Sequence, residues 1–224
     1  MLSLPMTRSK QTIGIIGSGN IGGALARAFT LAGHHVVIAN SRGPATLGTL
    51  VAELGELASA GTVEQAARAS DLVVVTIPLK AVANLPRDLL TGRLVIDTNN
   101  YYPDRDGHIA ELDNEVLTTS EYVAQHFAGA RVVKAFNHIP ALDIAEHAQK
   151  AGTPERRALM VYGEDAAAVE HVATLIDEIG FDAVKGGGLA ESWRIQRDTP
   201  GYGPRFSAGE LTEKLSVARR YSGS

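Results

Sequence analysis

A glycine-rich turn between an apolar run and a helical pattern constrains this chain more than any other feature. The apolar run Ile13–Ile16 leads directly into Gly17-Ser18-Gly19-Asn20-Ile21-Gly22. Apolar residues then recur at helical spacing, and Gly33 is placed to end that helix. The sequence therefore predicts a strand, a glycine loop and a helix in direct succession, which is the arrangement of a dinucleotide-binding unit.

Each glycine has a separate role in such a unit. Gly17 permits the tight turn, Gly19 lets the backbone approach a pyrophosphate, and Gly22 lets the helix pack close to the strand. The free N–H groups and the positive dipole end of the helix then face the phosphates. The competing interpretation is a loop that needs glycine only for its turn.

The composition limits the class of protein. A chain of 224 residues with 45% hydrophobic residues suits a single domain with a large core. A net charge of −4 gives no reason to expect nucleic acid as a partner. The chain has no cysteine, which excludes disulfides, thiolate metal sites and cysteine nucleophiles and fits a reducing cytosol. We therefore expect a cytoplasmic protein.

Neither a membrane span nor a signal peptide is expected. No window approaches the roughly 18 unbroken apolar residues that a membrane-spanning helix needs. Residues 1–11 are polar, lack a long apolar core, and are interpreted as a flexible N-terminal arm.

Short apolar runs alternate with helical patterns along the rest of the chain. The runs follow the first strand at residues 35–40, 56–60, 71–76, 94–97, 131–135, 159–162 and 181–185. This alternation predicts an α/β fold of the Rossmann type, doubly wound around a mainly parallel sheet. Such a sheet binds its ligand at the carboxyl ends of the strands.

The chain is predicted to be organised around one domain, residues 12–195. Residues 196–224 form a C-terminal loop and a short helical tail, which complete the site or a dimer interface. Thr62 with Gln65 is typical of a capping box, and Ser120 is interpreted as the cap of another helix. Residues 207–221 are predicted to form one amphipathic helix.

The end of the second strand indicates which dinucleotide is bound. An NAD-binding unit places a carboxylate about 20 residues after the glycine loop, on the ribose hydroxyls. Here Asn40-Ser41-Arg42 occupies that place, and it contains no carboxylate. A guanidinium attracts a 2′-phosphate and bonds it through two N–H groups, while Ser41 and Ser18 add hydroxyl donors. The sequence therefore favours NADP over NAD, unless Arg42 is an ordinary solvated residue.

The glycine loop joined to Asn40-Ser41-Arg42 resembles the deazaflavin-dependent NADP reductases, which pass hydride between NADP(H) and coenzyme F-420. The resemblance covers about residues 12 to 195. Its more specific parts are Asp97-Thr98-Asn99-Asn100-Tyr101-Tyr102-Pro103, Val133-Lys134-Ala135-Phe136-Asn137-His138-Ile139-Pro140 and Gly187-Gly188-Leu189-Ala190-Glu191-Ser192-Trp193. The nucleotide loop alone is shared with other NADP enzymes, including pyrroline-carboxylate reductases and the cytosolic domains of membrane ferric reductases.

The resemblance implies a compact domain that usually forms a homodimer. It implies Ser18, Ser41 and Arg42 at the 2′-phosphate. It also implies three strand-end loops around the nicotinamide and the second cofactor: residues 76–79, Asn99-Asn100 and Asn137-His138. Archaeal members tend to have a histidine after the sixth strand, where this chain has Asn137 and then His138. Its tail from residue 194 also differs from the archaeal pattern.

Hydride transfer between two rings needs proximity, alignment and the exclusion of water rather than a catalytic triad. Thr76-Ile77-Pro78 follows a buried strand and is interpreted as pressing one face of the nicotinamide, although an ordinary strand end has the same pattern. Asn99 and Asn100 can hydrogen-bond a carboxamide or a substrate carbonyl, or can cap a local turn.

Asn137 and His138 are the candidate catalytic residues, in a positioning role. His138 can donate to the deazaflavin carbonyl as charge builds there, or it is a satisfied loop histidine. A pocket lined by Asn137, His138 and Ser192 would favour an enzyme. Trp193 and Tyr202 form either a wall over the second ring or part of a dimer interface. No histidines have the spacing and acidic partner of a metal site, so no metal is expected.

We therefore predict an oxidoreductase that transfers hydride between NADP(H) and coenzyme F-420. Two alternatives stay open. One is an NADPH-dependent reductase of a flavin or small organic acceptor. The other is a non-catalytic NADP(H)-binding redox sensor, in which a surface helix would pack across the acceptor position.

Overall fold

The computed structural model describes residues 10–221. The predicted flexible arm, residues 1–11, therefore lies outside the described residues except for Lys10 and Gln11. Within the described part, eight strands form one sheet in the order β3-β2-β1-β4-β5-β6-β7-β8. They are β1 (Thr12–Ile16), β2 (His35–Ala39), β3 (Ala58–Ala60), β4 (Leu72–Val75), β5 (Leu94–Asp97), β6 (Arg131–Lys134), β7 (Ala158–Gly163) and β8 (Asp182–Lys185). The predicted doubly wound α/β fold is confirmed.

The sheet is parallel except at one pair of strands. β6 and β7 run antiparallel, with Val133 opposite Gly163 and Lys134 opposite Tyr162. The amino end of β7 therefore lies at the carboxyl end of β6. There the backbone N–H of Ala158 donates to the carbonyl of Phe206 over 2.8 Å. The antiparallel strand thus brings the C-terminal loop to the edge of the sheet where a parallel sheet binds its ligands.

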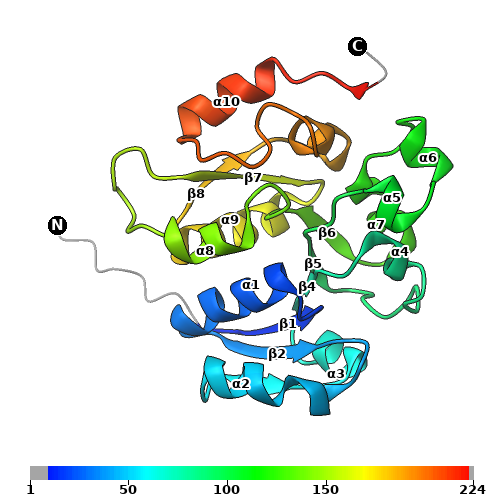
Figure 1. Ribbon diagram of the computed structural model, residues 1–224, viewed down its shortest axis with the longest axis vertical. Helices are drawn as coiled ribbons and strands as arrows, with labels where there is room; N and C mark the ends of the chain where they lie inside the picture. Colours follow the sequence, from blue (N-terminus) through cyan, green and yellow to red (C-terminus); the bar gives the residue numbers. More distant parts are fainter. Residues whose placement is uncertain (1–9, 222–224) are drawn as a thin grey trace.

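Side chains on one face of the sheet pack against four α-helices. These are α1 (Asn20–Leu31), α2 (Gly48–Leu54), α8 (Ala141–Glu146) and α9 (Ala166–Glu178), with the 3₁₀ helix η1 (Pro44–Leu47) before α2. Phe29 of α1 and Ile144 of α8 are buried here. α2 packs against β3 and α1, whereas α9 lies beside β7 and β8 (Figure 1).

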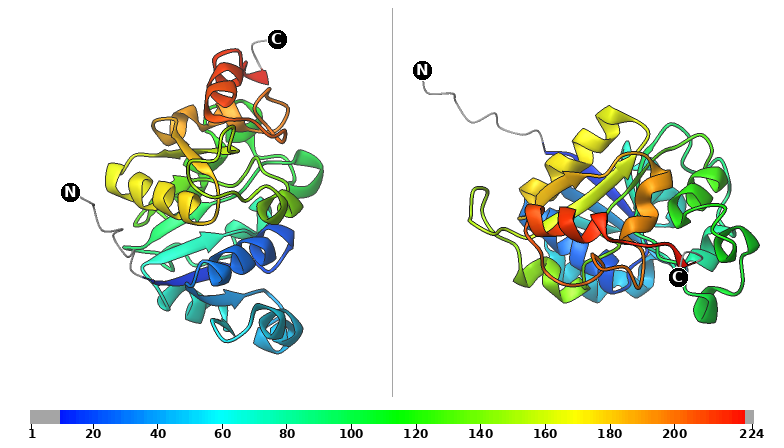
Figure 2. Two further views of the ribbon diagram at one scale, coloured as in Figure 1. Left: turned by 90° about the vertical axis from the view of Figure 1, so that its left-hand side faces the viewer. Right: turned by 90° about the horizontal axis from the view of Figure 1, so that it is seen from above.

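The opposite face is covered by a second layer. It contains α3 (Val63–Arg68), α4 (Leu79–Val82), α6 (Ala110–Asp113), α7 (Thr119–His126), η2 (Leu189–Ile195) and α10 (Ala208–Ser216). The short helix α5 (Pro103–Asp106) lies in the loop after β5. The left view of Figure 2 shows α10 at one end of the molecule and the β1–β2 region toward the other. Because both faces of the sheet are buried, its central strands are continuous apolar runs.

Helix caps follow the predictions in part. The capping box of Thr62 and Gln65 is present at the start of α3. The cap of α7 is Thr118, not Ser120, because Thr118 forms a capping box with Glu121. The predicted helix over residues 207–221 is shorter, since α10 ends at Ser216. Ser120 lies within the first turn of α7, where its hydroxyl has a different partner.

Candidate functional site

The main candidate site is a cleft of about 390 Å³ at the carboxyl ends of β1, β4, β5 and β6. This is the edge of the sheet where the predicted strand-end loops meet. The lining residues are Gly19, Asn20, Ile21, Thr76, Ile77, Pro78, Thr98, Asn99, Asn100, Tyr102, Arg105, Phe136, Asn137, Ile139, Pro140, Ala141 and Tyr202. The structure therefore brings most of the predicted nicotinamide residues together with the predicted wall residue Tyr202, and it adds Tyr102 and Arg105.

The glycines of the first loop differ in their surroundings. Gly17 has a φ of 118°, and a Cβ there would collide with the carbonyl oxygen of Thr76. A Cβ on Gly22 would collide with the carbonyl oxygen of Gly17. At Gly19, by contrast, a Cβ would meet no protein atom within 4 Å. Gly17 and Gly22 are thus required by the fold, whereas the space at Gly19 opens at the N-terminus of α1, where a phosphate fits.

A hydrogen-bonded group orders the end of β2. The Asn40 amide donates to Ser18 Oγ over 3.2 Å and to Thr46 Oγ1 over 3.0 Å. Asn40 Oδ1 in turn accepts the backbone N–H of Arg42 over 2.9 Å. Ser41 and Arg42 are exposed. Among the described residues, the guanidinium of Arg42 has no hydrogen bond or ion pair. A free guanidinium beside an ordered serine hydroxyl suits the 2′-phosphate of NADP.

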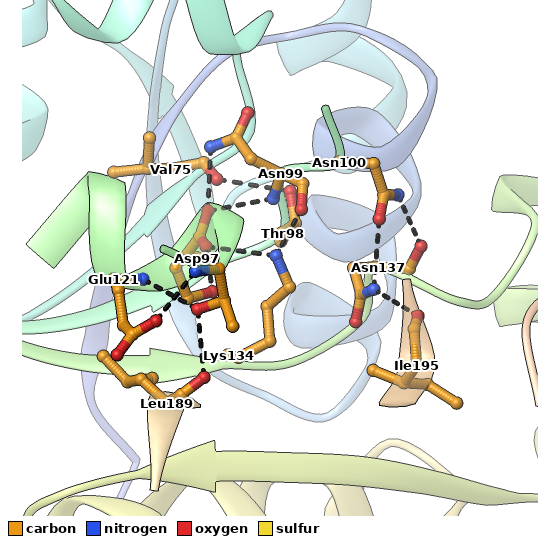
Figure 3. Close-up of polar contacts among 12 residues, drawn as sticks. Val75, Asp97, Thr98, Asn99, Asn100, Glu121, Lys134, Asn137, Leu189 and Ile195 are labelled. Carbon is orange, nitrogen blue, oxygen red and sulfur yellow. Dashed lines mark hydrogen bonds and ion pairs between the residues drawn. The ribbon is translucent and has the colours of Figure 1, made fainter. Parts of the chain in front are cut away.

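A buried ion pair lies beneath the loop that follows β5, residues 98–102, which is called the asparagine loop below. Asp97 is fully buried, and its carboxylate accepts hydrogen bonds from the Asn99 backbone (2.9 Å) and side chain (2.8 Å). Its other oxygen accepts from Lys134 (3.2 Å) and Ser120 (2.5 Å). Lys134 also donates to the Asn99 carbonyl. Figure 3 shows Lys134 between Asp97 and Asn99. This network fixes the backbone from which the cleft residues after β5 project.

Two opposing effects act on the pKa of Lys134. Burial lowers the pKa of the Lys134 ammonium, and the nearby Asp97 carboxylate opposes that shift. The side chains of Lys134 and Asp97 are 3% and 0% exposed. Removing either member of such a pair leaves a buried charge without compensation. The network is therefore a support of the site rather than a surface ion pair.

The loop after β5 is more ordered than its polar sequence indicates. The side chain of Asp106 is fully buried and accepts the backbone N–H of Tyr102 over 3.0 Å. Burial alone would raise the pKa of Asp106, but hydrogen bonds from Arg105 and the backbone outweigh burial and lower it. Arg105 also donates to the Asn100 carbonyl over 3.0 Å. Asp106 thus holds Tyr102 and Arg105 at the cleft.

A left-handed residue follows β6 and shifts the alternation of side chains by one. Ala135 and Phe136 are both buried in the core against α1 and α9, although neighbouring residues of a strand face opposite sides. Phe136 has a φ of 61°, which accounts for the shift. Asn137 consequently reaches the cleft. Its amide donates to Asn100 Oδ1 over 3.1 Å and to the Ile195 carbonyl over 2.9 Å.

His138 does not line the cleft. Its side chain is 2% exposed, and its Nε2 accepts the backbone N–H of Met160 over 3.0 Å. Burial and the nearby Arg157 lower the pKa of His138 to about 3, so the ring is neutral. The structure therefore separates the two predicted catalytic residues, with Asn137 at the cleft and His138 against β7. His138 is thus a buried loop histidine with its hydrogen bond satisfied, which was the alternative interpretation of the sequence.

Ser192 and Trp193 lie next to Asn100 and Asn137, and they line a cavity separate from the main cleft. Ser192 is 3% exposed and lines a small cavity of about 10 Å³ together with Lys134 and Asn137. It does not line the main cleft. Trp193 packs under the guanidinium of Arg194, 4.4 Å from its ring centroid. Of the predicted wall residues Trp193 and Tyr202, only Tyr202 reaches the main cleft.

Sequence reasoning missed Tyr102, Arg105 and Thr46 as site residues. Tyr102 and Tyr202 lie 100 positions apart in the chain, yet their hydroxyl oxygens are 2.7 Å apart. No local pattern indicates such a pairing. For Arg105 the available signal was the polar loop over residues 98–107, whose length exceeds that of a turn and indicates a role beyond connecting two elements.

Residues 10–221 contain no group of three or more His, Cys, Asp or Glu side chains arranged to hold a metal ion. In the same part of the chain, no helix has the length and apolar character needed to cross a membrane.

Comparison with known proteins agrees with this geometry. Residues 12–101 match the sequence profile of the family described as NADP oxidoreductase, coenzyme F-420-dependent. The crystal structure of a hypothetical protein from Sinorhizobium meliloti is 32% identical, with a TM-score of 0.75, over 91% of this chain and 97% of that one. A candidate F-420-dependent NADP reductase from Arthrobacter sp. FB24 is 25% identical, with a TM-score of 0.67, over 82% of this chain and 86% of that one.

Sequence similarity also extends to a larger protein. The metalloreductase STEAP3 of Rattus norvegicus is 26% identical over 187 residues, which are 82% of this chain and 35% of that protein. The chain spans between 35% and 53% of the length of four curated relatives that it matches. The similarity therefore covers about a third of the STEAP proteins and about half of the remaining relative.

Proposed function

The chain belongs to the coenzyme F-420-dependent family of NADP oxidoreductases, and we propose that it transfers a hydride between NADP(H) and the deazaflavin coenzyme F-420. The observation that carries this proposal is the cleft at which the glycine loop and the asparagine loop meet. Its volume of about 390 Å³ falls within the range of small-molecule sites. Two rings stacked there would bring donor and acceptor carbons together without a covalent step.

The residues around the cleft fit NADP(H). Gly19 leaves open space at the N-terminus of α1, where a pyrophosphate is accommodated by free N–H groups. Ser41 and Arg42 follow β2, and Ser18 of the loop after β1 is hydrogen-bonded to Asn40 there; these three residues would hold the 2′-phosphate. Thr76, Ile77 and Pro78 would lie against the nicotinamide, and Asn99 and Asn100 would face its carboxamide. The cofactor supplies the hydride, and these residues bind and orient it.

Tyr102 and Tyr202 in the cleft wall favour a second candidate function. An NADPH-dependent reductase of a flavin or small organic acceptor would use hydroxyl donors in the same place. A formed cleft with Asn137 in its wall supports an enzyme rather than a sensor, although His138 and Ser192 lie outside it. From the family resemblance we also propose a homodimer, which light scattering during size-exclusion chromatography would measure.

The test is stopped-flow absorbance at the deazaflavin band, with NADPH and with or without coenzyme F-420. The expected result is bleaching of the band together with stoichiometric oxidation of NADPH. The matched control is Arg42→Glu, which should slow bleaching at low NADPH concentration. Tight NADPH binding without bleaching would reject the F-420 proposal, and reduction of flavin mononucleotide instead would support the second candidate.

A further inference from the structure

Two tyrosine hydroxyls lie together in the wall of the cleft. Tyr102 follows β5, whereas Tyr202 lies in the C-terminal loop, and both line the cleft. Their oxygen atoms are 2.7 Å apart, so one hydroxyl donates to the other. Both side chains are partly buried. Hydride transfer itself uses no hydroxyl group, so this pair is available for another step.

The amide groups next to the pair have fixed orientations. The Asn137 amide nitrogen has two acceptors, Asn100 Oδ1 and the Ile195 carbonyl. Because Asn100 Oδ1 is thereby an acceptor, its amide nitrogen is the donor on the other side. That nitrogen donates to the Asn137 carbonyl over 2.7 Å and to the Tyr202 oxygen over 3.3 Å. Figure 3 shows Asn100 and Asn137 facing each other.

The oxygen of Tyr202 is thus surrounded by donors. Asn100 donates to it, and Tyr102 can donate to it as well. With both oxygen lone pairs occupied in this way, the proton of Tyr202 is left to donate elsewhere. If Tyr202 loses that proton, the Asn100 amide N–H stabilises the phenolate that remains.

The surrounding charges are consistent with a phenol that stays protonated. Burial raises the pKa of Tyr202, as does its hydrogen bond with Tyr102. The charged groups that act on it are Arg197, which lowers the pKa, and Asp198, which raises it. Over the Tyr102 ring lie the guanidinium groups of Arg105 (4.7 Å) and Arg197 (5.5 Å). Tyr202 is therefore a neutral acid at neutral pH.

We propose that Tyr202 donates a proton to the acceptor as the hydride arrives, with Asn100 stabilising its phenolate and Tyr102 passing on the replacement proton. This inference rests on the proposed hydride transfer. The hydride adds to an electrophilic atom of the acceptor, which is a carbon in a deazaflavin or an imine and the ring nitrogen N5 in a flavin. The displaced electron pair moves to a conjugated nitrogen or oxygen. The O–H bond of Tyr202 breaks, and a new bond to that heteroatom forms. Solvent returns a proton to the phenolate through Tyr102.

A purely structural role for the pair would be to hold the C-terminal loop at the cleft. That loop has other attachments, since Gly203 N–H donates to the His138 carbonyl and Arg157 donates to the Gly203 carbonyl over 2.7 Å. Loss of one phenol should therefore leave the loop attached. A structural role also predicts no change in the pH dependence of hydride transfer, whereas proton donation does.

The experiment measures single-turnover NADPH oxidation with coenzyme F-420, flavin mononucleotide and a cyclic imine as separate acceptors. The variants are Tyr202→Phe, Tyr102→Phe and the control Tyr122→Phe, whose side chain lies in α7 away from the cleft. For Tyr202→Phe we expect a rate loss of about 100-fold, the usual size of a general-acid effect. Tyr102→Phe should lose less, and Tyr122→Phe should match the wild type. NADPH affinity, from fluorescence titration, should stay within about twofold in all three variants.

The pH profile separates proton donation from positioning. The wild-type rate should be flat from about pH 6 to about pH 9, because Tyr202 stays protonated there. In Tyr202→Phe the rate should fall as pH rises, because the proton must come from solvent. A Tyr202→Phe variant with the wild-type rate and profile would overturn the inference, as would a wild type that reduces none of the three acceptors. Reduction of only the flavin or the imine, still dependent on Tyr202, would reject the F-420 function and support proton donation.

Discussion

The two walls of the cleft are built from different groups. The nucleotide wall, Gly17–Gly22 with Asn40–Arg42, lines the cleft at Gly19, Asn20 and Ile21 and continues beyond it. It presents backbone N–H groups, open space and a guanidinium without a partner among the described residues. The acceptor wall, Asn99–Tyr102 with Asn137 and Tyr202, presents amides and phenols in one connected set of hydrogen bonds. The first wall comes from two segments that are joined by α1 and β2, whereas the second joins three segments that lie farther apart in the chain.

This difference separates binding from chemistry. A backbone wall recognises a group that all NADP enzymes share, and it depends on a few glycines. A side-chain wall can be changed one residue at a time, and its geometry depends on the supports behind it. We therefore expect substitutions in the nucleotide wall to change NADPH affinity. Substitutions in or behind the acceptor wall should change stability and hydride transfer.

The largest effect is expected behind the acceptor wall, at Lys134. Lys134→Met leaves the buried Asp97 carboxylate without its cation and should lower the free energy of unfolding by about 3–5 kcal/mol. The control is Lys185→Met, which removes an exposed pair with Glu170 and should change stability by less than about 1 kcal/mol. Urea denaturation measures both. Equal effects of the two substitutions would show that Lys134 does not support the wall.

The next effect concerns Arg42 in the nucleotide wall. Arg42→Glu replaces the free guanidinium with a charge that repels a 2′-phosphate. The dissociation constant of NADPH should rise about 100-fold, and that of NADH should stay within about twofold. Arg68→Glu, in α3, is the control. Fluorescence titration with both cofactors is the measurement, and an equal loss for both would remove Arg42 from phosphate recognition.

Low pH should destabilise the fold next to the acceptor wall, because His138 is buried there as a neutral ring. The pKa of His138 is about 3 in the fold and about 6.5 in the unfolded chain, so the unfolded state binds more protons between these values. Stability should therefore be fully present above about pH 6.5 and decline as pH falls toward 3, with a loss of about 2 kcal/mol at pH 5. In His138→Gln this loss should disappear. Denaturation at pH 7 and pH 5 compares the two proteins, and identical losses would contradict the assignment.

The smallest effect is expected at Gly19 and tests whether this glycine of the nucleotide wall leaves space for a phosphate. Gly19→Ala adds a Cβ in open space, so stability should change by less than about 0.5 kcal/mol. NADPH affinity should fall about tenfold because the methyl group occupies the phosphate space. Gly22→Ala is the matched variant, and its collision with the Gly17 carbonyl should destabilise the fold by about 1–3 kcal/mol. Unchanged NADPH binding by Gly19→Ala would move the pyrophosphate away from this glycine.

The nucleotide wall was predictable because its signals are local. The glycine loop, the apolar run before it and the strand end at Asn40 lie within 30 residues of one another. The other strands were also predictable, because buried parallel strands such as Leu72–Val75 are continuous apolar runs. Ser120 was assigned as a cap because a serine near a helix start is the usual signal, but Asp97 was its partner.

The acceptor wall was predictable only in part, because its contacts join distant segments. Asn100 and Asn137 were both named from the sequence, but their hydrogen bond depends on two strands ending side by side. His138 was expected to act beside Asn137. A prediction from strand alternation assumes extended backbone at every residue, so it fails at Phe136, whose backbone is left-handed. A glycine would have indicated such a conformation in the sequence, but a phenylalanine does not.

The turn at Phe136 also affects how relatives can be compared. Alignments match residues by position, but which side chain enters the cleft depends on the backbone conformation one residue earlier. A relative with an extended residue at this position would present the side chain at 138, not the one at 137, to its substrate. Two homologues with the same letters in this segment would then differ in the residue that meets the acceptor. Specificity can thus diverge through one dihedral angle while the aligned sequences stay the same.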